Sequence, residues 1–295
     1  MVVFDEQTNA ALKKIHDGGH ILFREIGRIC EQHGIHYYLD SGNLIGAVRE
    51  HSDLKWDDDA DIGMTREDFE IFRKAAKEEL KPGFQFVEPG DLGNAFFDFV
   101  PRVVLTESRL KANSEEERFY GNGIYNHMVC DFFIVDDVAD FTPFHKFARM
   151  LQIIVYGMSM GKRYRLELSE YHGFQKAVIA VLAFIGKPFS GRTLCRWYDK
   201  IGKMEHGKNQ KHGRCYYSNC LFPDLHRIFR KEWFKEPVNV EIDGEIFPGP
   251  CGYDHILRTL YDSDYMVPPD PDSITMPHCE PEYVELDYDA YPGSR

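Results

Sequence analysis

Acidic side chains crowd the short segment Trp56-Asp57-Asp58-Asp59-Ala60-Asp61 at a spacing that suits metal chemistry. On a strand, residues two apart point to the same side, so Asp57, Asp59 and Asp61 would present their carboxylates to one site. Unpaired carboxylates so placed repel one another, and a divalent cation removes that cost. Hard oxygen ligands suit Mg²⁺ or Mn²⁺, which also accept substrate phosphates as ligands. The run therefore predicts a magnesium or manganese site.

Other interpretations of this run are weaker. A solvated acidic turn is common for charge runs, but apolar Trp56, Ala60, Ile62 and Met64 embed this run in an expected strand. A calcium loop would need Gly at its sixth position and Glu at its twelfth. This chain has Ile62 and Asp68 there, so a calcium loop of the EF-hand type is excluded.

A glycine turn precedes the acidic run. Ser41-Gly42-Asn43 is expected to open a short helix that extends over residues 44–49. Free backbone amides and the helix dipole at such a start make a site for phosphate oxygens. Arg49 would add a cationic contact to phosphate or, equally well, form a surface salt bridge. An anion cradle beside metal carboxylates predicts an enzyme that moves a phosphate-containing group.

The elements that position these residues mix helices and strands. Apolar spacing predicts a long opening helix that begins near Leu12 and ends after His33, where Gly34 is a natural stop. Thr65 is the expected N-cap of a helix over residues 66–80. Aromatic and β-branched residues predict strands at residues 35–39, 60–64, 84–87, 96–105 and 124–135. We therefore expect an α+β fold.

The second half begins with a helical segment. Helices are expected over residues 144–204, interrupted by glycines. Residues 238–242 and 245–247 then flank Asp243-Gly244, which is typical of a two-residue β-hairpin, and the tail beyond Pro268 is expected to wrap the surface. We expect one catalytic domain over residues 1–295, with a core at about 1–140, a helical segment at about 141–205, and a hairpin and tail at about 206–295.

Bulk properties restrict the class of protein. The 295 residues can bury a substantial core, and the formal net charge of −13 argues against general affinity for nucleic acid. The first residues lack the features of a secretory signal, and the seven cysteines have no repeated close spacing. These features predict a cytoplasmic protein with reduced thiols. Cys215 and Cys220, with His212, are either ordinary thiols or half of a zinc site.

The helical segment is apolar and basic. Its longest uncharged apolar stretch, residues 177–186, falls short of the roughly 20 residues that span a bilayer, and we expect a buried or interfacial helix. The segment carries an excess of basic residues, namely Lys162, Arg163, Arg165, Lys176, Lys187, Arg192, Arg196, Lys200 and Lys203. Peripheral contact with the inner, anionic face of a membrane is one interpretation, and a helical lid with solvated charges is the other.

The motifs together resemble a known family. Tyr38-Leu39-Asp40-Ser41-Gly42-Asn43-Leu44-Ile45-Gly46-Ala47-Val48-Arg49 and the acidic run through Met64 are similar to the LicD family, which is related to the fukutin group. Cys130-Asp131-Phe132-Phe133-Ile134-Val135-Asp136 resembles the family's later strand. The segment from Tyr261 to Pro269, with His278, resembles its carboxyl-terminal signature. Asn43 stands where the family usually has Thr, and Ile134 where it usually has Pro.

The resemblance implies a fold and a reaction. The family has a nucleotidyltransferase-like fold and transfers phosphocholine or similar groups from cytidine nucleotide donors onto glycans. It implies a CDP-choline type of donor and a glycan or lipid-linked glycan acceptor. Asp59 and Asp61 would hold Mg²⁺, while Asp131 would share the metal or accept the proton of the attacking hydroxyl.

The expected substrate-binding residues are Ser41, Gly42, Asn43, Arg49, Trp56 and His278. A choline head group would favour aromatic faces, and the other candidates close in sequence are Tyr37, Tyr38, Phe96, Phe97 and Tyr125. Other functions remain open: a nucleotidyltransferase that releases pyrophosphate from a nucleoside triphosphate, or a binding module for nucleotide or metal that does not turn over. The sequence specifies neither the acceptor nor the head group nor the oligomeric state.

Overall fold

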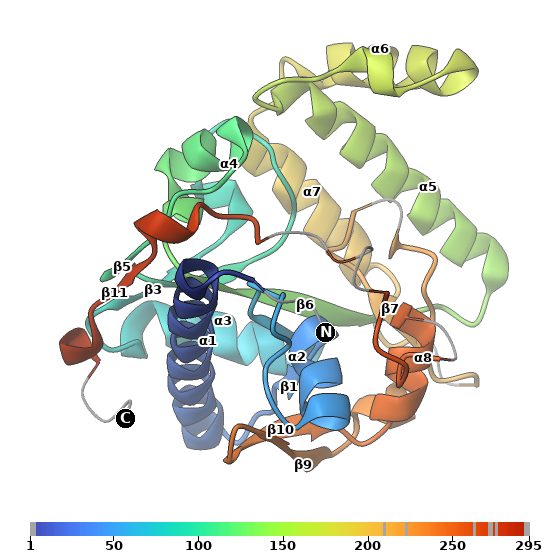
Figure 1. Cartoon of the computed structure of the whole chain (residues 1–295). Coiled ribbons are helices and arrows are strands. Elements are labelled where there is room, and N and C mark those ends of the chain that lie inside the picture. The colour runs from blue at the N-terminus through green and yellow to red at the C-terminus, as the bar shows by residue number, and fades with distance from the viewer. Residues whose placement is uncertain are drawn as a thin grey trace.

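A mixed sheet forms the centre of the fold. The computed structural model describes residues 4–208, 211–221, 224–261, 264–270, 274 and 277–291, and within these residues the main sheet has seven strands. Its central path runs in the order β1 (Tyr38–Leu39), β2 (Asp61–Thr65), β6 (Val129–Asp137), β4 (Arg102–Leu105) and β3 (Phe84–Val87). The far half of β6 pairs instead with β7 (Arg214–Tyr217), which pairs with β8 (Phe229–Arg230). Helices flank this sheet (Figure 1), so the expected α+β class is confirmed.

The register of the central strands brings ionisable residues into one row. β2 and β6 run parallel, and Asp61 lies opposite Asp131. β4 runs antiparallel to β6, and Arg102 lies opposite the same Asp131. Residues opposite one another on neighbouring strands place their Cβ atoms about 5 Å apart on the same face. The sheet therefore builds a row of Asp61, Asp131 and Arg102.

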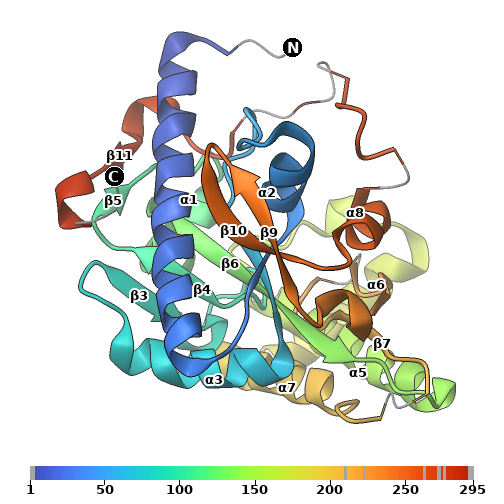
Figure 2. The same cartoon turned by 90° about the horizontal axis from the view of Figure 1, so that it is seen from below.

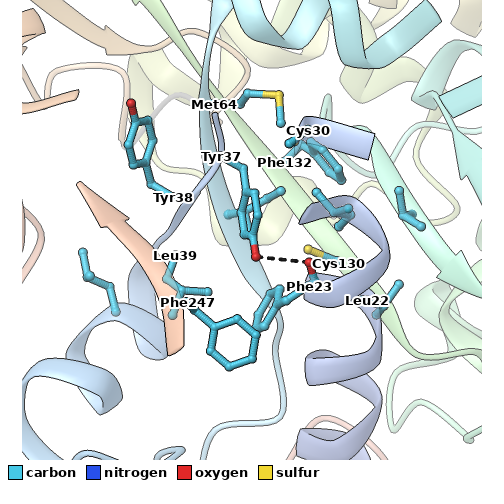
Figure 3. Packing of buried hydrophobic residues seen from close by; sticks show 14 of the residues in the cluster. Leu22, Phe23, Cys30, Tyr37, Tyr38, Leu39, Met64, Cys130, Phe132 and Phe247 are labelled. Atoms are coloured by element: carbon cyan, nitrogen blue, oxygen red, sulfur yellow. Dashed lines mark hydrogen bonds between the residues drawn. The ribbon is translucent and has the colours of Figure 1, made fainter. Parts of the chain in front are cut away.

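The opening helix is as expected from the sequence. α1 (Glu6–His33) begins at Asp5, whose carboxylate accepts the N–H of Thr8 at 2.7 Å. It ends at Gly34, which adopts the left-handed conformation with φ 63°. The Tyr37 hydroxyl donates to the Phe23 carbonyl at 3.1 Å and joins α1 to the segment before β1 (Figure 3). Each fully buried apolar side chain of α1 contributes about 1.5–3 kcal/mol to the stability of the fold.

Alternation along β6 separates the core face from the polar face. α3 (Arg66–Glu79) starts at Thr65, as the sequence predicts, and its Phe69 and Phe72 rings lie 6.2 and 5.0 Å from the Phe132 ring. Phe132 therefore faces the helices. Asp131 and Phe133 point the other way and line a cavity. The acidic site thus lies on the face of the sheet opposite α3.

The glycine turn folds differently from the expectation. The sequence predicts a turn over residues 40–43 and a helix over 44–49, whereas α2 (Ser41–Ile45) already includes Ser41 and Gly42 and continues as a π-helical turn, Gly46–Glu50. Residues 57–60 precede β2 instead of lying within it. Strand alternation therefore does not apply to Asp57 and Asp59, and their directions are set by the loop.

Three expected strands are shorter than predicted. β1 begins only at Tyr38, within the expected range 35–39. β4 begins at Arg102 because the preceding residues form a turn in which the Asp98 carboxylate accepts the N–H of Val100 at 2.9 Å. β6 begins at Val129, since Gly123, with φ 87°, leads into the 3-10 turn Ile124–Asn126. Apolar composition gave the right strands but not these polar and glycine-dependent turns.

The helical segment contains α5 (Thr142–Ser159), α6 (Gly173–Gly186) and α7 (Gly191–Lys203). These helices share a hydrophobic cluster separate from the main core. Figure 1 shows α5 and α6 at one margin of the molecule, away from α1. In the described part of the chain, no single helix has the length and apolarity to cross a membrane; α6 and α7 meet those criteria only as a pair bent by 115°.

The C-terminal part closes around the sheet. β9 (Pro237–Ile242) and β10 (Glu245–Pro250) form the expected hairpin, with φ 49° at Asp243 and φ 85° at Gly244. α8 (Tyr253–Tyr261) follows the hairpin in sequence and contacts α2 (Figure 2). The described tail residues 278–280 lie against residues 111–113, just before α4 (Glu115–Phe119), and β11 (Glu285–Leu286) then pairs with β5 (Ser108–Arg109). The expected wrapping of the surface by the tail is confirmed.

Candidate active site

A cavity of about 270 Å³ opens on the polar face of the sheet. Asp59, Asp61, Asp131 and His278, which the sequence assigns to the site, all line it. The other lining residues that bear on chemistry or binding are Asp58, Glu117, His127, Phe97, Tyr125 and Phe133. We call this space the carboxylate cavity. It joins residues from the acidic run, from β6 and from the tail, which are far apart in sequence.

Asp57 lies apart from the carboxylate cavity. Its carboxylate packs against Gly42, so that a Cβ on that glycine would fall 1.6 Å from Asp57 Oδ2. Gly42 is therefore required for the approach of a protein carboxylate to the start of α2. Burial, together with Asp59 and Asp58, raises the pKa of Asp57 to about 8. The group beside the expected phosphate cradle is thus the chain's own Asp57 carboxyl.

The residues that depart from the family pattern have local structural roles. The Asn43 side-chain oxygen accepts the N–H of Asp61 at 2.8 Å and so fixes the first residue of β2. The Ile134 N–H donates to the Asn219 side-chain oxygen at 2.8 Å. A proline at position 134 would lack this N–H.

Ser41, with φ 48°, is in contact with the Tyr261 side chain of α8.

Arg102 is the cation behind Asp131. Its side chain is 1% exposed, and its Nε lies 2.7 Å from Asp131 Oδ1, although these two atoms are not aligned as a hydrogen bond. Its Nη1 also donates to Asp98 at 3.1 Å, and its guanidinium lies 4.8 Å from the centre of the Tyr125 ring. The Tyr125 hydroxyl donates to Asp98 at 3.0 Å. Asp131 is thereby held in one orientation.

The acidic residues in the cavity raise one another's pKa. Burial raises the pKa of Asp61 well above its usual range, and the neighbours Asp59, Asp131, Asp57 and Asp40 raise it further. Burial raises the pKa of Asp131 to about 7, although Arg102 acts in the opposite direction. Desolvation by the surrounding protein and the charge on Asp58 raise the pKa of Asp59 to about 6, although the Asp59 side chain is 57% exposed. A cation bound among them would relieve this repulsion.

His278 closes the rim of the cavity. Its backbone N–H donates to Asp58 at 2.6 Å, and its Nδ1 lies 3.1 Å from Asp58 and 3.9 Å from Asp59. The side-chain contact of the His278 ring with Asp58 raises the pKa of His278 to about 9, so the ring is cationic at neutral pH. Asp58, Asp59 and His278 each place a potential ligand atom within 4.8 Å of the others. Asp58 is therefore a candidate that the sequence did not single out.

Arg49 and Trp56 belong to a second cavity, of about 400 Å³, which we call the Arg49 cavity. The Arg49 side chain is 6% exposed, and its Nη1 donates to the Tyr265 carbonyl at 2.9 Å. It also lies over the Trp56 ring at 5.9 Å, while its Nη2 is buried without a hydrogen bond. Arg49 is thus buried, with an ion pair to its neighbour Glu50 at 2.7 Å. Asp262 and Ser263 of the carboxyl-terminal signature lie outside the described residues.

Sequence reasoning missed Arg102 and Asp40. A charged residue inside the apolar stretch around β4 must be paired when it is buried, and this signal could have found Arg102. Asp40 is 1% exposed, and burial raises its pKa to about 6. Its carboxylate faces the Tyr217 hydroxyl, and neither group makes a hydrogen bond of normal geometry. No pattern in the sequence distinguishes Asp40 from an ordinary turn residue.

Several candidate residues have other roles. Tyr37, Tyr38 and Phe96 are buried in hydrophobic clusters, whereas Phe97 and Tyr125 line the carboxylate cavity. The cysteines are free thiols, and Cys215 and Cys220 are buried. Among the described residues, the group with metal-ligand spacing contains neither of them. The interpretation as ordinary thiols is therefore preferred.

Known proteins are similar to this chain in sequence. Residues 34–97, which contain Gly42 and the acidic run, match the family model LicD/FKTN/FKRP, nucleotidyltransferase domain. The resemblance to the LicD family is confirmed. The chain is also 25% identical over 258 residues to the lipopolysaccharide cholinephosphotransferase LicD of Haemophilus influenzae (strain ATCC 51907 / DSM 11121 / KW20 / Rd). That similarity covers 83% of this chain and 87% of the relative.

Proposed function

We propose that this protein transfers phosphocholine, or a similar phosphorylated group, from a CDP-linked donor to a hydroxyl of a cell-surface glycan or its precursor. The observation that carries the proposal is the row in which Asp61 and Asp131 lie opposite one another on parallel strands, with Asp59 in the same cavity. The relative is named for cholinephosphate transfer to lipopolysaccharide, which supports an enzyme of the transferase class.

The carboxylates have the ligand chemistry for a hard divalent cation, although among the described residues the group whose ligand atoms already lie within 4.8 Å of one another is Asp58, Asp59 and His278. Asp59, Asp61 and Asp131 offer oxygen ligands of the kind that Mg²⁺ prefers, and Mn²⁺ accepts the same set. Their mutual effect on pKa is the physical sign that the cavity holds more negative charge than its cations balance. Bound there, the metal would neutralise charge on the donor phosphates. Asp57, which packs on Gly42, is a less direct candidate for this set than Asp58.

The protein's own groups account for the remaining needs of the reaction. Arg102 orients Asp131 through the 2.7 Å contact. Asp131 either shares the metal or, when it is free of the metal, accepts the proton of the attacking hydroxyl, and a pKa raised to about 7 suits the second role near neutral pH. Cationic His278 at the rim would attract the anionic donor. Such transfer depends mainly on positioning and electrostatics.

The walls of the carboxylate cavity suit a quaternary ammonium group. Phe97, Tyr125 and Phe133 line it together with the carboxylates. The Phe97 and Tyr125 rings meet edge to face with their centres 5.1 Å apart. Cation–π contact with such rings contributes about 0.5–2 kcal/mol, and Arg102 already makes such a contact with Tyr125 at 4.8 Å. These features support choline over an uncharged head group.

The test is CMP release by Asp61→Asn. Purified protein is incubated with Mg²⁺ and CDP-choline, and we expect the variant to lose at least about 100-fold in turnover. Its melting temperature without metal should equal or exceed that of the parent, because burial and four neighbouring carboxylates disfavour the charged form of Asp61. Loss of activity would then not reflect unfolding.

The matched control is Asp91→Asn, since Asp91 is 54% exposed and contacts Arg192 instead of the carboxylate cavity. It should keep parental turnover. Unchanged turnover in Asp61→Asn would contradict the proposal. Release of pyrophosphate from a nucleoside triphosphate would identify a nucleotidyltransferase, and donor binding without turnover in the parent protein would identify a binding module.

A further inference from the structure

Helix α6 exposes an unusual amount of apolar surface. Its fourteen residues, GFQKAVIAVLAFIG, include one charged side chain, Lys176. Phe174 is 84% exposed, Phe184 71% and Val181 57%. Only Ile179, Ala183 and Gly186 of this helix are buried. Of the two expected arrangements, a buried or an interfacial helix, the buried one is not found, because the apolar face points outward.

The orientation of α6 is fixed by close packing on its inner face. A Cβ on Gly186 would fall 2.0 Å from the Met158 carbonyl oxygen, and a Cβ on Gly161 would fall 2.2 Å from that of Ala183. A Cβ on Gly157 would meet the Leu182 side chain at 2.5 Å. These glycines let α6 approach α5 and the turn after it. The helix cannot roll to bury Phe174 and Phe184 without losing these contacts.

The helix beneath α6 adds further apolar surface. In α5, Phe147, Met150 and Ile153 are 46%, 48% and 37% exposed. Residues three apart lie on the same side of a helix, so these side chains form one strip. Figure 1 shows α5 directly under α6 at the outer margin of the molecule.

Positive charge accompanies this apolar surface. Residues 141–203 contain 11 Lys and Arg and three Asp and Glu, a formal excess of eight positive charges in a chain whose net charge is −13. Lys176 and Lys187, both exposed, lie near the two ends of α6. The Lys187 ammonium lies 5.8 Å from the centre of the Phe184 ring, and the Lys162 ammonium donates to the Lys187 carbonyl at 2.7 Å. Four of the basic residues form ion pairs with acidic residues outside this range, namely Arg149, Arg163, Arg192 and Lys203. The positive charge next to the exposed aromatic residues is therefore carried by the lysines at the ends of α6.

We propose that α6 docks on an anionic phospholipid membrane and lies in the plane of its interface. At about 1.5 Å per residue the helix is about 21 Å long, shorter than the roughly 30 Å hydrocarbon core, so it would lie on the membrane instead of crossing it. Apolar residues facing the acyl chains with lysines at the headgroups are the chemistry of an interfacial helix. The local positive excess selects anionic lipid as the occupant. This docking does not depend on the transfer reaction.

Flotation with vesicles tests the proposal. The full chain is mixed with vesicles of phosphatidylcholine alone or of equimolar phosphatidylcholine and phosphatidylglycerol, without donor or metal. We expect it to float with the anionic vesicles and to float much less with the neutral ones. High salt should weaken anionic binding. The double variant Phe174→Gln with Phe184→Gln should lower the partition coefficient at least about tenfold, and Lys176→Gln with Lys187→Gln should lower it on anionic vesicles.

The control is Ile246→Gln, because Ile246 is 57% exposed on β10, outside the helical segment. It should float like the parent, and all variants should keep the parent's melting temperature. Failure of the parent to float with anionic vesicles would overturn the proposal, as would equal flotation of the phenylalanine variant. Sedimentation showing a dimer that the phenylalanine variant abolishes, without flotation, would overturn it in favour of a second copy of this chain.

Discussion

Replacing Arg102 with methionine should destabilise the protein strongly. Its side chain is 1% exposed and lies between Asp98, 8% exposed, and Asp131, 22% exposed. Methionine retains much of the apolar volume but leaves these carboxylates without their cation. Breaking a buried ion pair by removing one partner costs about 3–5 kcal/mol, because the remaining charge stays desolvated. The decrease in the free energy of unfolding should therefore be several times that of an ordinary surface substitution.

The expected change in melting temperature follows from the size of the chain. Unfolding entropy of about 2.1 cal/mol/K per residue gives about 0.6 kcal/mol/K for 295 residues. A loss of about 3–5 kcal/mol then lowers the midpoint by about 5–8 °C. Calorimetry at neutral pH in the presence of a chelator measures this shift without a contribution from bound metal.

Second substitutions show whether uncompensated charge is the cause. Adding Asp98→Asn or Asp131→Asn to Arg102→Met should recover part of the lost stability, because each removes one unpaired carboxylate. The control Arg109→Met changes an exposed arginine on β5 and should stay within about 0.5 kcal/mol of the parent. A midpoint for Arg102→Met within about 1 °C of the parent, or double variants less stable than Arg102→Met, would refute this account.

Two further predictions concern the rim and the glycine contact. The pKa of His278 is raised from 6.5 to about 9, so protonation of its ring stabilises the folded state. The parent should therefore be more stable than His278→Gln. This difference in stability should be full below pH 6.5 and lost as pH rises through about 9. Thermal melts across this range measure it, and a difference independent of pH would contradict the assignment. Gly42→Ala places a Cβ 1.6 Å from the present position of Asp57 Oδ2, so the carboxylate must move and CMP release should fall by about 100-fold. The control Gly27→Ala, whose nearest contact would be 3.4 Å from Tyr37, should keep parental turnover, and equal activity in both variants would disprove the requirement at Gly42.

The sequence predicts the regular elements of this fold well where local patterns determine them. Thr65 as an N-cap, Gly34 as a C-cap and Asp243-Gly244 as a hairpin turn all act within a few residues, and each is found as expected. The expected helical segment over residues 144–204 is also found, as the helices α5 to α7. The beginnings of β4 and β6 are missed because polar and glycine turns compete with strand propensity there.

The site is predictable in part. Asp59, Asp61 and Asp131 are identified from spacing and motif, and the fold brings them to one cavity. The sequence did not predict that Asp57 packs against Gly42, away from the other carboxylates. This position depends on where β2 begins. Asp58 and Arg102 acquire their partners only through contacts across the chain, to His278 and Asp131 respectively. Pairings at such sequence separations leave no local periodicity.

The row across the central strands explains how an acidic site can exist in a folded protein. Parallel register forces Asp61 and Asp131 together, which would favour protonation of both in a buried setting. Arg102 on β4 lies next to Asp131 and acts to lower the pKa of that carboxyl. Asp131 separates Arg102 from Asp61 in the row. Asp61 is accordingly the carboxylate whose pKa is raised well above its usual range. Asp61 is therefore the carboxyl whose charged form the protein supports least, and this is where we expect a divalent cation, by replacing a proton, to contribute most.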